Sequence, residues 1–176
     1  MVRMNHRHVV ILVGHGAPPL GFPREEVARL KALEGRRRAA GAAMSAEEET
    51  LDRKIRAFPR TPENDPYRTG IEALAAALRP RLGGAALLVA YNEFCGPSLE
   101  EAVASAAEGG ATAITVLPSM LTPGGVHAEV EIPESVTALQ ARFPDLTLVY
   151  AWPFDLDAVA GLLAAQVESA TPAHSR

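Results

Sequence analysis

The chain has 176 residues, of which 48% are hydrophobic and 22% are charged, and this composition is typical of one globular domain. Its formal net charge of −4 and aromatic content of 5% argue against a nucleic-acid-binding surface, which usually combines a basic stripe with aromatic residues. Cys95 is the only cysteine, which excludes an intramolecular disulfide and a zinc cluster held by several thiolates.

The N-terminal segment contains no apolar run long enough for a signal peptide or a membrane-spanning helix. Together with the single cysteine, this favours a cytoplasmic protein without a membrane partner. His6 and His8 precede the first apolar run and His174 lies near the C-terminus, so we expect none of them to have a functional role. Residues 170–176 are expected to form a flexible tail.

Four apolar runs predict β-strands, and the segments between them have helical periodicity. The predicted strands cover residues 8–14, 85–91, 111–117 and 146–152. This alternation indicates an α/β fold with an open, mainly parallel four-stranded sheet flanked by helices on both faces. Residues 1–176 are expected to form a single domain.

Residues 18–64 form an insertion after the first predicted strand, with candidate helices over 24–35 and 46–57. Ser45 and Glu48 fit a capping box for the second of these helices. Insertions of this length are usually lids or peripheral hairpins, and the sequence is compatible with both. The basic run of residues 36–38 is interpreted as a solvated helix end.

Three further helices have identifiable starting residues, namely Asp65 before Pro66, Ser98 with Glu101, and Asp155. In the first and the last of these helices, the spacing of apolar residues predicts one face directed toward the core. These residues are Ile71, Leu74, Ala75 and Leu78 in the first helix, and Val159, Leu162, Leu163 and Val167 in the last.

Two histidines lie in glycine-containing loops that follow predicted strands. His15 belongs to the Gly-His-Gly motif of residues 14–16, and His127 ends the Gly-Gly-Val-His motif of residues 124–127. Ligands of open parallel sheets bind beyond the carboxyl ends of the strands, so we expect the two imidazoles at one edge of the sheet. A histidine in such a loop can also cap a helix or fill a polar turn.

Carboxylates accompany both histidines. Glu93 ends the second predicted strand before a Gly-Pro turn, where it is either a site residue or an exposed turn acid. If residues 127–131 are helical, His127 and Glu131 share a face, whereas in an extended segment Glu129 joins them. Imidazole and carboxylate ligands suit divalent first-row metals. Cys95 is expected to be a small buried residue, and the sequence contains no Walker A, GxGxxG, HExxH or GxSxG motif.

Four motifs occur in a fixed order along the chain. They are Val-Gly-His-Gly at 13–16, Tyr-Asn-Glu-Phe-Cys-Gly-Pro-Ser-Leu-Glu-Glu-Ala at 91–102, Val-Leu-Pro-Ser-Met-Leu at 116–121 and Gly-Gly-Val-His-Ala-Glu-Val-Glu-Ile-Pro at 124–133. Over residues 8–16 and about 66–168 the chain resembles the CbiX/SirB class of sirohydrochlorin chelatases. The insertion at 18–64 departs from the compact members of that class.

The resemblance implies the chelatase-like half of a ferrochelatase-type fold and an ATP-independent metal chelatase of cobalamin or siroheme biosynthesis. Carried over by motif, His15, His127 and Glu93 are expected to be catalytic and to bind the metal. Glu131 is expected to be a further metal ligand, at a position where the class usually has Asp. The divalent ion, Co²⁺, Fe²⁺ or Ni²⁺, is expected as a substrate, and no permanently bound cofactor is expected.

The implied partners are the divalent ion, a tetrapyrrole substrate such as sirohydrochlorin, and a second copy of the chain in a homodimer. Arg24, Arg60 and Arg68 are candidates to receive the carboxylate groups of the tetrapyrrole. The alternative to an enzyme is a non-catalytic metal or tetrapyrrole carrier that uses the same cleft. A structural domain with incidental histidines is the third interpretation, and such a domain would bind metal only weakly.

Overall fold

The computed structural model describes residues 8–170, in which four strands form one parallel sheet. The strands are β1 (His8–Gly14), β2 (Ala86–Tyr91), β3 (Ala113–Pro118) and β4 (Thr147–Tyr150), in the spatial order β2-β1-β3-β4. The neighbouring strands pair in parallel throughout, which confirms the predicted α/β fold and its four strands. His6, His174 and the tail from residue 171 onward lie outside the described residues.

β1 is an inner strand of the sheet, and its sequence explains that position. Every residue from Val9 to Gly14 is buried, as expected for an apolar run that is covered on both faces. Val13 pairs with Ala90 of β2 and with Pro118 of β3, so the three strands end at one edge. The loops that carry the predicted site residues leave the sheet at that edge.

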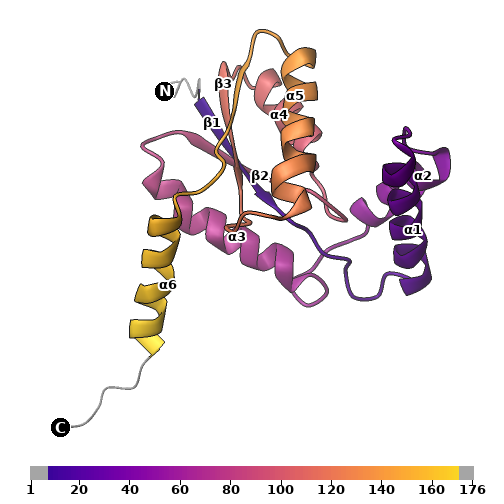
Figure 1. Cartoon of the computed structure of the whole chain (residues 1–176), viewed down its shortest axis with the longest axis horizontal. Coiled ribbons are helices and arrows are strands. Elements are labelled where there is room, and N and C mark those ends of the chain that lie inside the picture. Colours follow the sequence, from indigo (N-terminus) through magenta and orange to yellow (C-terminus); the bar gives the residue numbers. More distant parts are fainter. Residues whose placement is uncertain (1–7, 171–176) are drawn as a thin grey trace.

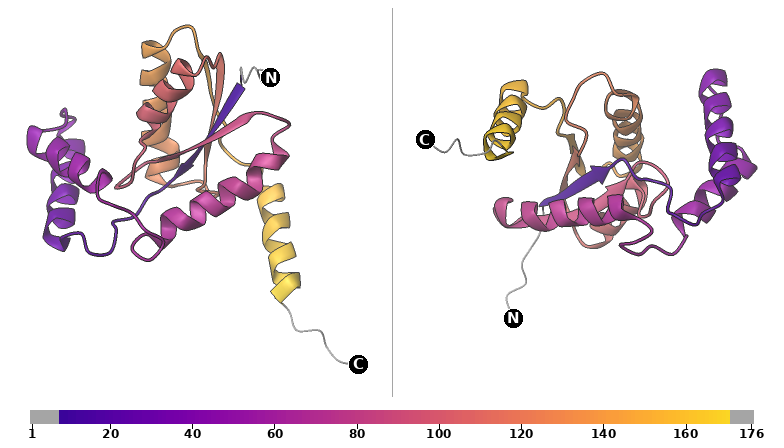
Figure 2. Two further views of the ribbon diagram at one scale, coloured as in Figure 1. Left: turned by 180° about the vertical axis from the view of Figure 1, so that it is seen from behind. Right: turned by 90° about the horizontal axis from the view of Figure 1, so that it is seen from below.

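Three helices cover the two faces of the sheet (Figures 1 and 2). α4 (Leu99–Glu108) and α5 (Ile132–Arg142) pack on one face, in a core that includes Ile11, Val103 and Ile132. α3 (Pro66–Leu78) packs on the other face, where Ile71 and Ala75 are buried against residues of β1. Leu74, which the sequence predicted to face this core, is 49% exposed, so that prediction is wrong. A short 3₁₀ helix, η1 (Arg79–Arg81), follows α3.

α6 (Leu156–Ala170) extends away from the sheet, beyond one end of α3 (Figures 1 and 2). Asp155 caps it as predicted, because the Asp155 carboxylate accepts the backbone N–H of Asp157 at 2.8 Å. The prediction that its apolar residues face the core is wrong. None of the residues of α6 is buried, and Leu162, Leu163 and Val167 are exposed by 60%, 57% and 66%.

The insertion contains α1 (Arg24–Ala40) and α2 (Ala46–Arg56), which lie side by side apart from the helices that cover the sheet (Figure 1). This confirms the predicted helical insertion. α1 is five residues longer than the predicted helix at 24–35, because Gly41, rather than Gly35, adopts the left-handed conformation that ends it. A small core of Phe22, Leu30, Ile55 and Phe94 joins the hairpin to the turn that follows β2.

The start of α2 differs in one detail from the predicted capping box. The Ser45 side chain accepts the backbone N–H of Glu48, as expected. The Glu48 carboxylate does not return to Ser45 but is 2% exposed and paired with Arg37 at 2.8 Å. Across residues 8–170, no helix is long and apolar enough to span a membrane.

Candidate metal centre

The loop after β1 fixes the orientation of His15. Its backbone N–H donates a hydrogen bond to the Tyr67 hydroxyl at 2.8 Å, and its ring Nδ1 lies 2.7 Å from the carbonyl oxygen of Gly16. A carbonyl oxygen can only accept a hydrogen bond, so this contact requires a proton on Nδ1. The lone pair of a neutral His15 imidazole is therefore on Nε2.

The loop after β2 is held against the loop after β1 by continued backbone pairing. The backbone N–H of Asn92 donates to the Gly14 carbonyl at 2.9 Å, and that of Glu93 donates to the His15 carbonyl at 2.8 Å. Gly16 has a φ of +91°, and a Cβ at this position would lie 1.9 Å from the Glu93 carbonyl oxygen. Only glycine permits this approach, which places His15 next to Glu93.

His127 begins a widened helical turn, η2 (His127–Glu131), that leads directly into α5. The N–H of Ile132 donates to the His127 carbonyl, five residues back, which is the hydrogen bond of a π-helix. The Tyr150 hydroxyl donates to the Ala128 carbonyl at 2.7 Å and so ties this turn to the end of β4. Burial and the nearby Glu129 raise the pKa of Tyr150 to about 12, so this donor stays protonated.

Of the two conformations considered for residues 127–131, the structure adopts the helical one, with His127 and Glu131 on one face. His127 Nδ1 lies 2.7 Å from Glu131 Oε2 and 2.9 Å from the amide nitrogen of Asn92, which itself donates to Glu131 Oε2 at 2.6 Å. Because a carboxylate only accepts, we assign the proton to Nδ1. His127 Nε2 then has the lone pair, and it lies 3.8 Å from Glu93 Oε1. Glu129 is directed elsewhere, since its carboxylate accepts the backbone N–H of Gly124 at 2.7 Å.

Three of the four predicted metal ligands therefore meet at one point. One ligand atom each from His15, Glu93 and His127 lies within 4.8 Å of the other two. The two imidazole rings are 4.5 Å apart between centroids and nearly perpendicular, and Glu93 is 8% exposed. Two imidazole nitrogens and one carboxylate oxygen form a donor set that suits a divalent first-row metal and leaves coordination positions open.

Glu131, the fourth predicted ligand, contacts the site through His127. A carboxylate on the far nitrogen of a ligating histidine fixes its tautomer and ring orientation. Burial alone would raise the pKa of Glu131, but hydrogen bonds from Arg38, Asn92 and His127 outweigh it and lower the pKa to about 2. Glu131 is thus ionised at neutral pH.

Cations from the insertion reach both carboxylates of the site, which the sequence analysis did not foresee. Lys31 Nζ lies 2.8 Å from Glu93 Oε1, and Arg38 forms an ion pair with Glu131. Residues 36–38 lie near the end of α1, as interpreted, and Arg36 and Arg38 are exposed. Arg37 and Arg38 are also paired with Glu48 and Glu131, which that interpretation did not include. The sequence contained one indication of these contacts. Lys31 and Arg38 are spaced i, i+7, which places them on one face of a predicted helix that begins soon after His15.

The three arginines proposed as receivers of substrate carboxylates lie elsewhere. Arg60 is 3% exposed and pairs with Asp65 at 2.6 Å, while its guanidinium also donates to backbone carbonyls of Ala17, Ile55 and Phe94. Arg60 thus connects the loops that follow β1 and β2 with the end of α2 and the start of α3. Arg68 pairs with Glu72 in the next turn of α3, and Arg24 is exposed at the start of α1.

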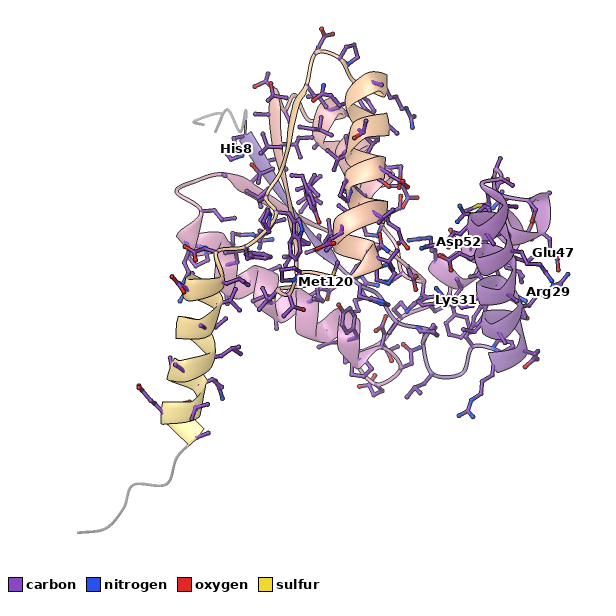
Figure 3. All side chains as sticks on the ribbon, viewed as in Figure 1. His8, Arg29, Lys31, Glu47, Asp52 and Met120 are labelled. Atoms are coloured by element: carbon purple, nitrogen blue, oxygen red, sulfur yellow. The ribbon has the colours of Figure 1, made fainter. Side chains whose placement is uncertain are left out.

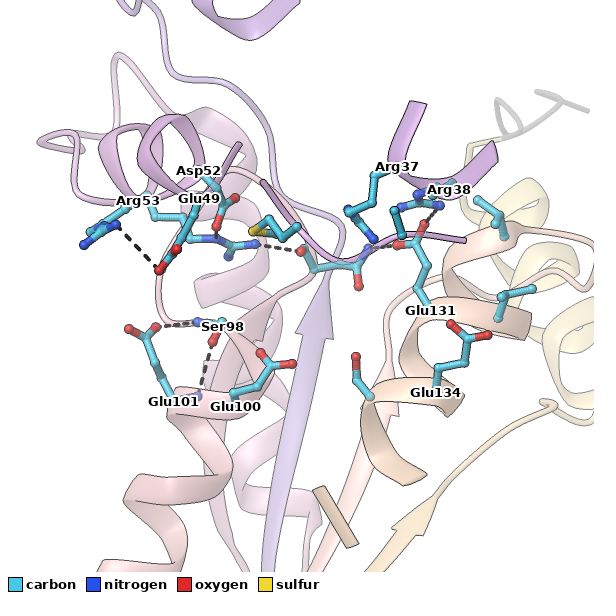
Figure 4. Close-up of a pocket in the computed structure, with 18 of the residues that line it drawn as sticks. Arg37, Arg38, Glu49, Asp52, Arg53, Ser98, Glu100, Glu101, Glu131 and Glu134 are labelled. Atoms are coloured by element: carbon cyan, nitrogen blue, oxygen red, sulfur yellow. Dashed lines mark hydrogen bonds and ion pairs between the residues drawn. The ribbon is translucent and has the colours of Figure 1, made fainter. Parts of the chain in front are cut away.

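A cavity of about 1120 Å³ opens beside the site, between the insertion and the ends of α4 and α5 (Figure 4). It borders the site through Asn92 and Glu131, and a second cavity of about 120 Å³ is lined by Glu93 and Glu131. Four arginines and six carboxylates line the larger cavity, together with exposed apolar side chains. The arginines are Arg37, Arg38, Arg53 and Arg56, the carboxylates are Glu49, Asp52, Glu100, Glu101, Glu131 and Glu134, and the apolar residues include Met44, Val126 and Val130.

Cys95 is 1% exposed, as expected from the sequence. Burial raises the pKa of its thiol, which keeps the sulfur protonated and unreactive at neutral pH. The neighbouring Phe94 has a φ of +59°, an uncommon conformation for a residue with a side chain. Its ring belongs to the small core under the insertion, so the turn that carries Glu93 is fixed from that side.

Comparison with known proteins gives consistent matches. The sequence pattern of the family described as CbiX matches residues 63–170. A sirohydrochlorin ferrochelatase from Priestia megaterium is 32% identical over 69 residues, which are 39% of this chain and 26% of that protein. The matched stretch thus spans about a quarter of that relative.

Solved structures resemble the whole described fold. A CbiX protein from Marinobacter aquaeolei VT8 has a TM-score of 0.54 at 21% identity, covering 92% of this chain and 94% of its own. The sirohydrochlorin chelatase SirB from Bacillus subtilis subspecies spizizenii, solved in complex with cobalt, has a TM-score of 0.51 at 18% identity. That match covers 92% of this chain and 50% of SirB, and at such identities both structures show a common fold.

Proposed function

The chain belongs to the CbiX family, and from this membership we propose that it is an ATP-independent chelatase that inserts Co²⁺ or Fe²⁺ into sirohydrochlorin. The observation that carries the proposal is the meeting of His15, Glu93 and His127 within 4.8 Å, with the Nε2 lone pair of each imidazole left available. In this proposal the divalent ion is a substrate, and the protein keeps no permanently bound cofactor.

The first task of a chelatase is to take a hydrated divalent ion and hold it loosely. His15 and His127 offer neutral nitrogen ligands, and the buried carboxylate of Glu93 offsets part of the charge of the ion. Three protein ligands leave open positions at which the pyrrole nitrogens can replace water. The ion can therefore pass to the macrocycle one ligand at a time.

The second task is to accept the two protons that the pyrrole nitrogens release. Each imidazole nitrogen that lets go of the ion becomes a base near neutral pH. In His127, the proton taken up at Nε2 creates an imidazolium whose Nδ1–H faces the ionised carboxylate of Glu131 at 2.7 Å. Glu131 thus stabilises the protonated base without being a ligand itself.

The macrocycle is proposed to enter the cavity of about 1120 Å³ that borders Asn92 and Glu131. Its volume is slightly above the usual range of small-molecule sites, as a large macrocycle requires, and Met44, Val126 and Val130 present exposed apolar surface to it. The apolar side chains of the lining suit a flat ring and its four arginines suit acidic substituents, although six carboxylates line the same cavity.

We further propose a homodimer in the cytoplasm. The described fold matches half of SirB, so a second copy would supply what the second half supplies in the longer protein. We expect the exposed apolar side chains of α6 to be buried between the two copies, namely Leu162, Leu163 and Val167. The single cysteine is consistent with a reducing compartment.

The experiment is a steady-state assay of the absorbance change of sirohydrochlorin with Co²⁺ or with Fe²⁺. Catalysis predicts a rate proportional to enzyme concentration, with many turnovers per chain. His15→Ala and His127→Ala should each lower that rate by about 100-fold, the contribution of a positioned base or ligand. Stoichiometric binding of metal or tetrapyrrole without turnover would contradict the proposal and favour the carrier.

A further inference from the structure

One face of α1 presents three charged side chains to the candidate metal centre. Lys31, Glu34 and Arg38 are spaced i, i+3 and i+7, and Glu34 is paired with both cations. Figure 3 shows Lys31 on the side of α1 that faces the sheet, whereas Arg29 and Glu47 lie on the opposite side. We call Lys31, Glu34 and Arg38 the α1 clasp.

The α1 clasp closes on the two carboxylates of the site. Lys31 Nζ lies 2.8 Å from Glu93 Oε1 and 5.5 Å from the centre of the Phe94 ring, and Arg38 is paired with Glu131. Glu93 is one of the three groups that can hold the divalent ion, and Glu131 orients another. Lys31 therefore already occupies a carboxylate that the ion would bind, and Arg38 occupies the carboxylate that orients His127.

A divalent ion and the α1 clasp cannot both use these carboxylates fully. Glu93 has a side chain that is 9% exposed, so it cannot turn to solvent to serve both cations. At short distances in a partly buried site, a dication and an ammonium group repel each other strongly. Glu93 Oε1 is both the oxygen paired with Lys31 and the one that lies 3.8 Å from His127 Nε2, so entry of the ion should displace Lys31. The charge of the ion also repels Arg38, which is paired with Glu131 beside the site.

We propose that Lys31 and Arg38 together form a binding site for carboxylate groups. In the metal-free protein this site is occupied by Glu93 and Glu131. A bound divalent ion frees Lys31 and Arg38, which then bind the carboxylate groups of the incoming macrocycle. The identity of that ligand rests on the proposed function. The competition between the ion and the α1 clasp does not, because it follows from the contacts of the described residues alone.

The released side chains would remain in place to receive a ligand. The Lys31 and Arg38 side chains are 44% and 35% exposed, so both can be reached from solvent, and Arg38 also lines the cavity of about 1120 Å³. Burial would raise the pKa of Glu34, but its hydrogen bonds and ion pairs with Lys31 and Arg38 lower it, so Glu34 stays ionised and keeps the two cations together. An ammonium and a guanidinium on one helix face suit a polycarboxylate.

The first arm of the test measures Co²⁺ binding by calorimetry, with no tetrapyrrole present. The double variant Lys31→Gln/Arg38→Gln should bind Co²⁺ about tenfold more tightly than the wild type, because the competing charges are gone. Arg36→Gln is the matched control, since it removes the same charge from an exposed position of α1 and should leave the affinity unchanged. Equal or weaker Co²⁺ binding by the double variant overturns the proposal.

The second arm measures binding of zinc uroporphyrin, a polycarboxylate macrocycle whose centre is already filled, with and without saturating Co²⁺. Binding linkage requires that Co²⁺ strengthen macrocycle binding to the wild type, and we expect about a fivefold effect. The double variant should lose this effect, and Arg36→Gln should keep it. The single variant Lys31→Gln retains Arg38 and should show an intermediate effect in both arms. It replaces the double variant in the test if the double variant does not fold.

A wild type in which Co²⁺ leaves zinc uroporphyrin binding unchanged overturns the proposal as well. Neither arm depends on turnover, so a chain that shows both effects but no chelatase activity refutes the proposed function and leaves the α1 clasp standing. Conversely, an active chelatase whose Co²⁺ affinity does not respond to Lys31→Gln/Arg38→Gln refutes the α1 clasp alone.

Discussion

The orientation of His127 depends on one carboxylate. Glu131 accepts the proton of Nδ1, so Nε2 of the imidazole is directed toward Glu93. Arg38 and Asn92 also bind Glu131, and these contacts lower its pKa to about 2 although burial acts in the opposite direction. A group whose pKa is lower in the folded state than its ordinary value of 4.5 stabilises the fold above that value.

Glu131→Gln should therefore change how stability depends on pH. In the wild type the contribution of the carboxylate is complete above about pH 4.5 and is lost as the pH falls toward 2. After a discount for solvent screening, we expect the wild type to exceed the variant by about 1 kcal/mol at pH 6, and the gap to shrink below about pH 4.5 and to close only near pH 2 and below. Denaturant-induced unfolding of both proteins at several pH values measures this difference in the free energy of unfolding. A difference between the wild type and Glu131→Gln that does not change with pH would refute the explanation.

Arg60 is a structural residue rather than a receiver of substrate. Its guanidinium is 3% exposed and its partner Asp65 is 1% exposed, so loss of the arginine leaves a buried carboxylate without a cation. Arg60→Met should lower the free energy of unfolding by about 3 kcal/mol. Arg68→Met removes an exposed pair with Glu72 and should cost less than about 1 kcal/mol. Chemical denaturation of both variants measures these two losses of stability. Equal losses would contradict the structural role of Arg60.

At the scale of elements, the site is assembled by the loops that follow β1 and β2. Their backbones are joined by the hydrogen bonds from Asn92 to Gly14 and from Glu93 to His15, at 2.9 and 2.8 Å. The third loop reaches the same edge through η2, whose widened turn places His127 and Glu131 on one face. The geometry of the metal centre thus depends on how closely the first two loops approach each other.

Gly16→Ala tests this dependence. A Cβ would lie 1.9 Å from the Glu93 carbonyl oxygen, so the two loops must separate. We expect a loss of about 3 kcal/mol of stability and an affinity for Co²⁺ reduced by about tenfold. Gly21→Ala is the matched control, because Gly21 has a φ of +88° but no atom within 4 Å of the added Cβ. It should cost about 1–2 kcal/mol and leave Co²⁺ binding unchanged, as calorimetry and denaturation can establish.

Element types were predictable from the sequence because the four strands are apolar runs and several of the helices begin with a capping residue. Asp65, Ser98 and Asp155 act as the sequence suggested. The burial of helix faces was less predictable, since periodicity shows that a face is apolar but not whether a partner covers it. Leu74 and Leu162 are the examples.

The meeting of His15, Glu93 and His127 could be predicted because parallel strands end at one edge. The contacts of Lys31 and Arg38 could not, since they depend on where the insertion packs, and that is set by the small core of Phe22, Leu30, Ile55 and Phe94. The role of Glu131 was likewise only partly predictable from the sequence. The spacing of four residues placed it beside His127, but its position on Nδ1 needed the three-dimensional structure.

At the scale of the whole molecule, α6 is the element that the described chain leaves uncovered. Leu156, Leu162, Leu163 and Val167 are all more than half exposed. Apolar helix faces of this kind mark interaction sites. In the proposed homodimer, a second copy of this chain covers this face.

In the proposed homodimer, the double substitution Leu162→Glu/Leu163→Glu should shift the protein from dimer to monomer. Charges in an apolar interface are costly to desolvate, so the dissociation constant should rise by about 100-fold or more. Leu20→Glu is the control, because Leu20 is 67% exposed but belongs to the insertion. Sedimentation velocity over a range of concentrations is the measurement. A wild type that is monomeric at every concentration would contradict the dimer.

Stopped-flow mixing of sirohydrochlorin with protein that carries one equivalent of Co²⁺ tests most directly whether His15, Glu93 and His127 deliver the ion. We expect a single-turnover formation of cobalt sirohydrochlorin at least about 100-fold faster than with the same concentration of free Co²⁺. Replacement of both histidines by alanine should reduce that rate to the value for free Co²⁺. A loaded protein no faster than free Co²⁺, or a full rate in the double variant, would contradict the assignment of a metal-delivering centre to these three residues.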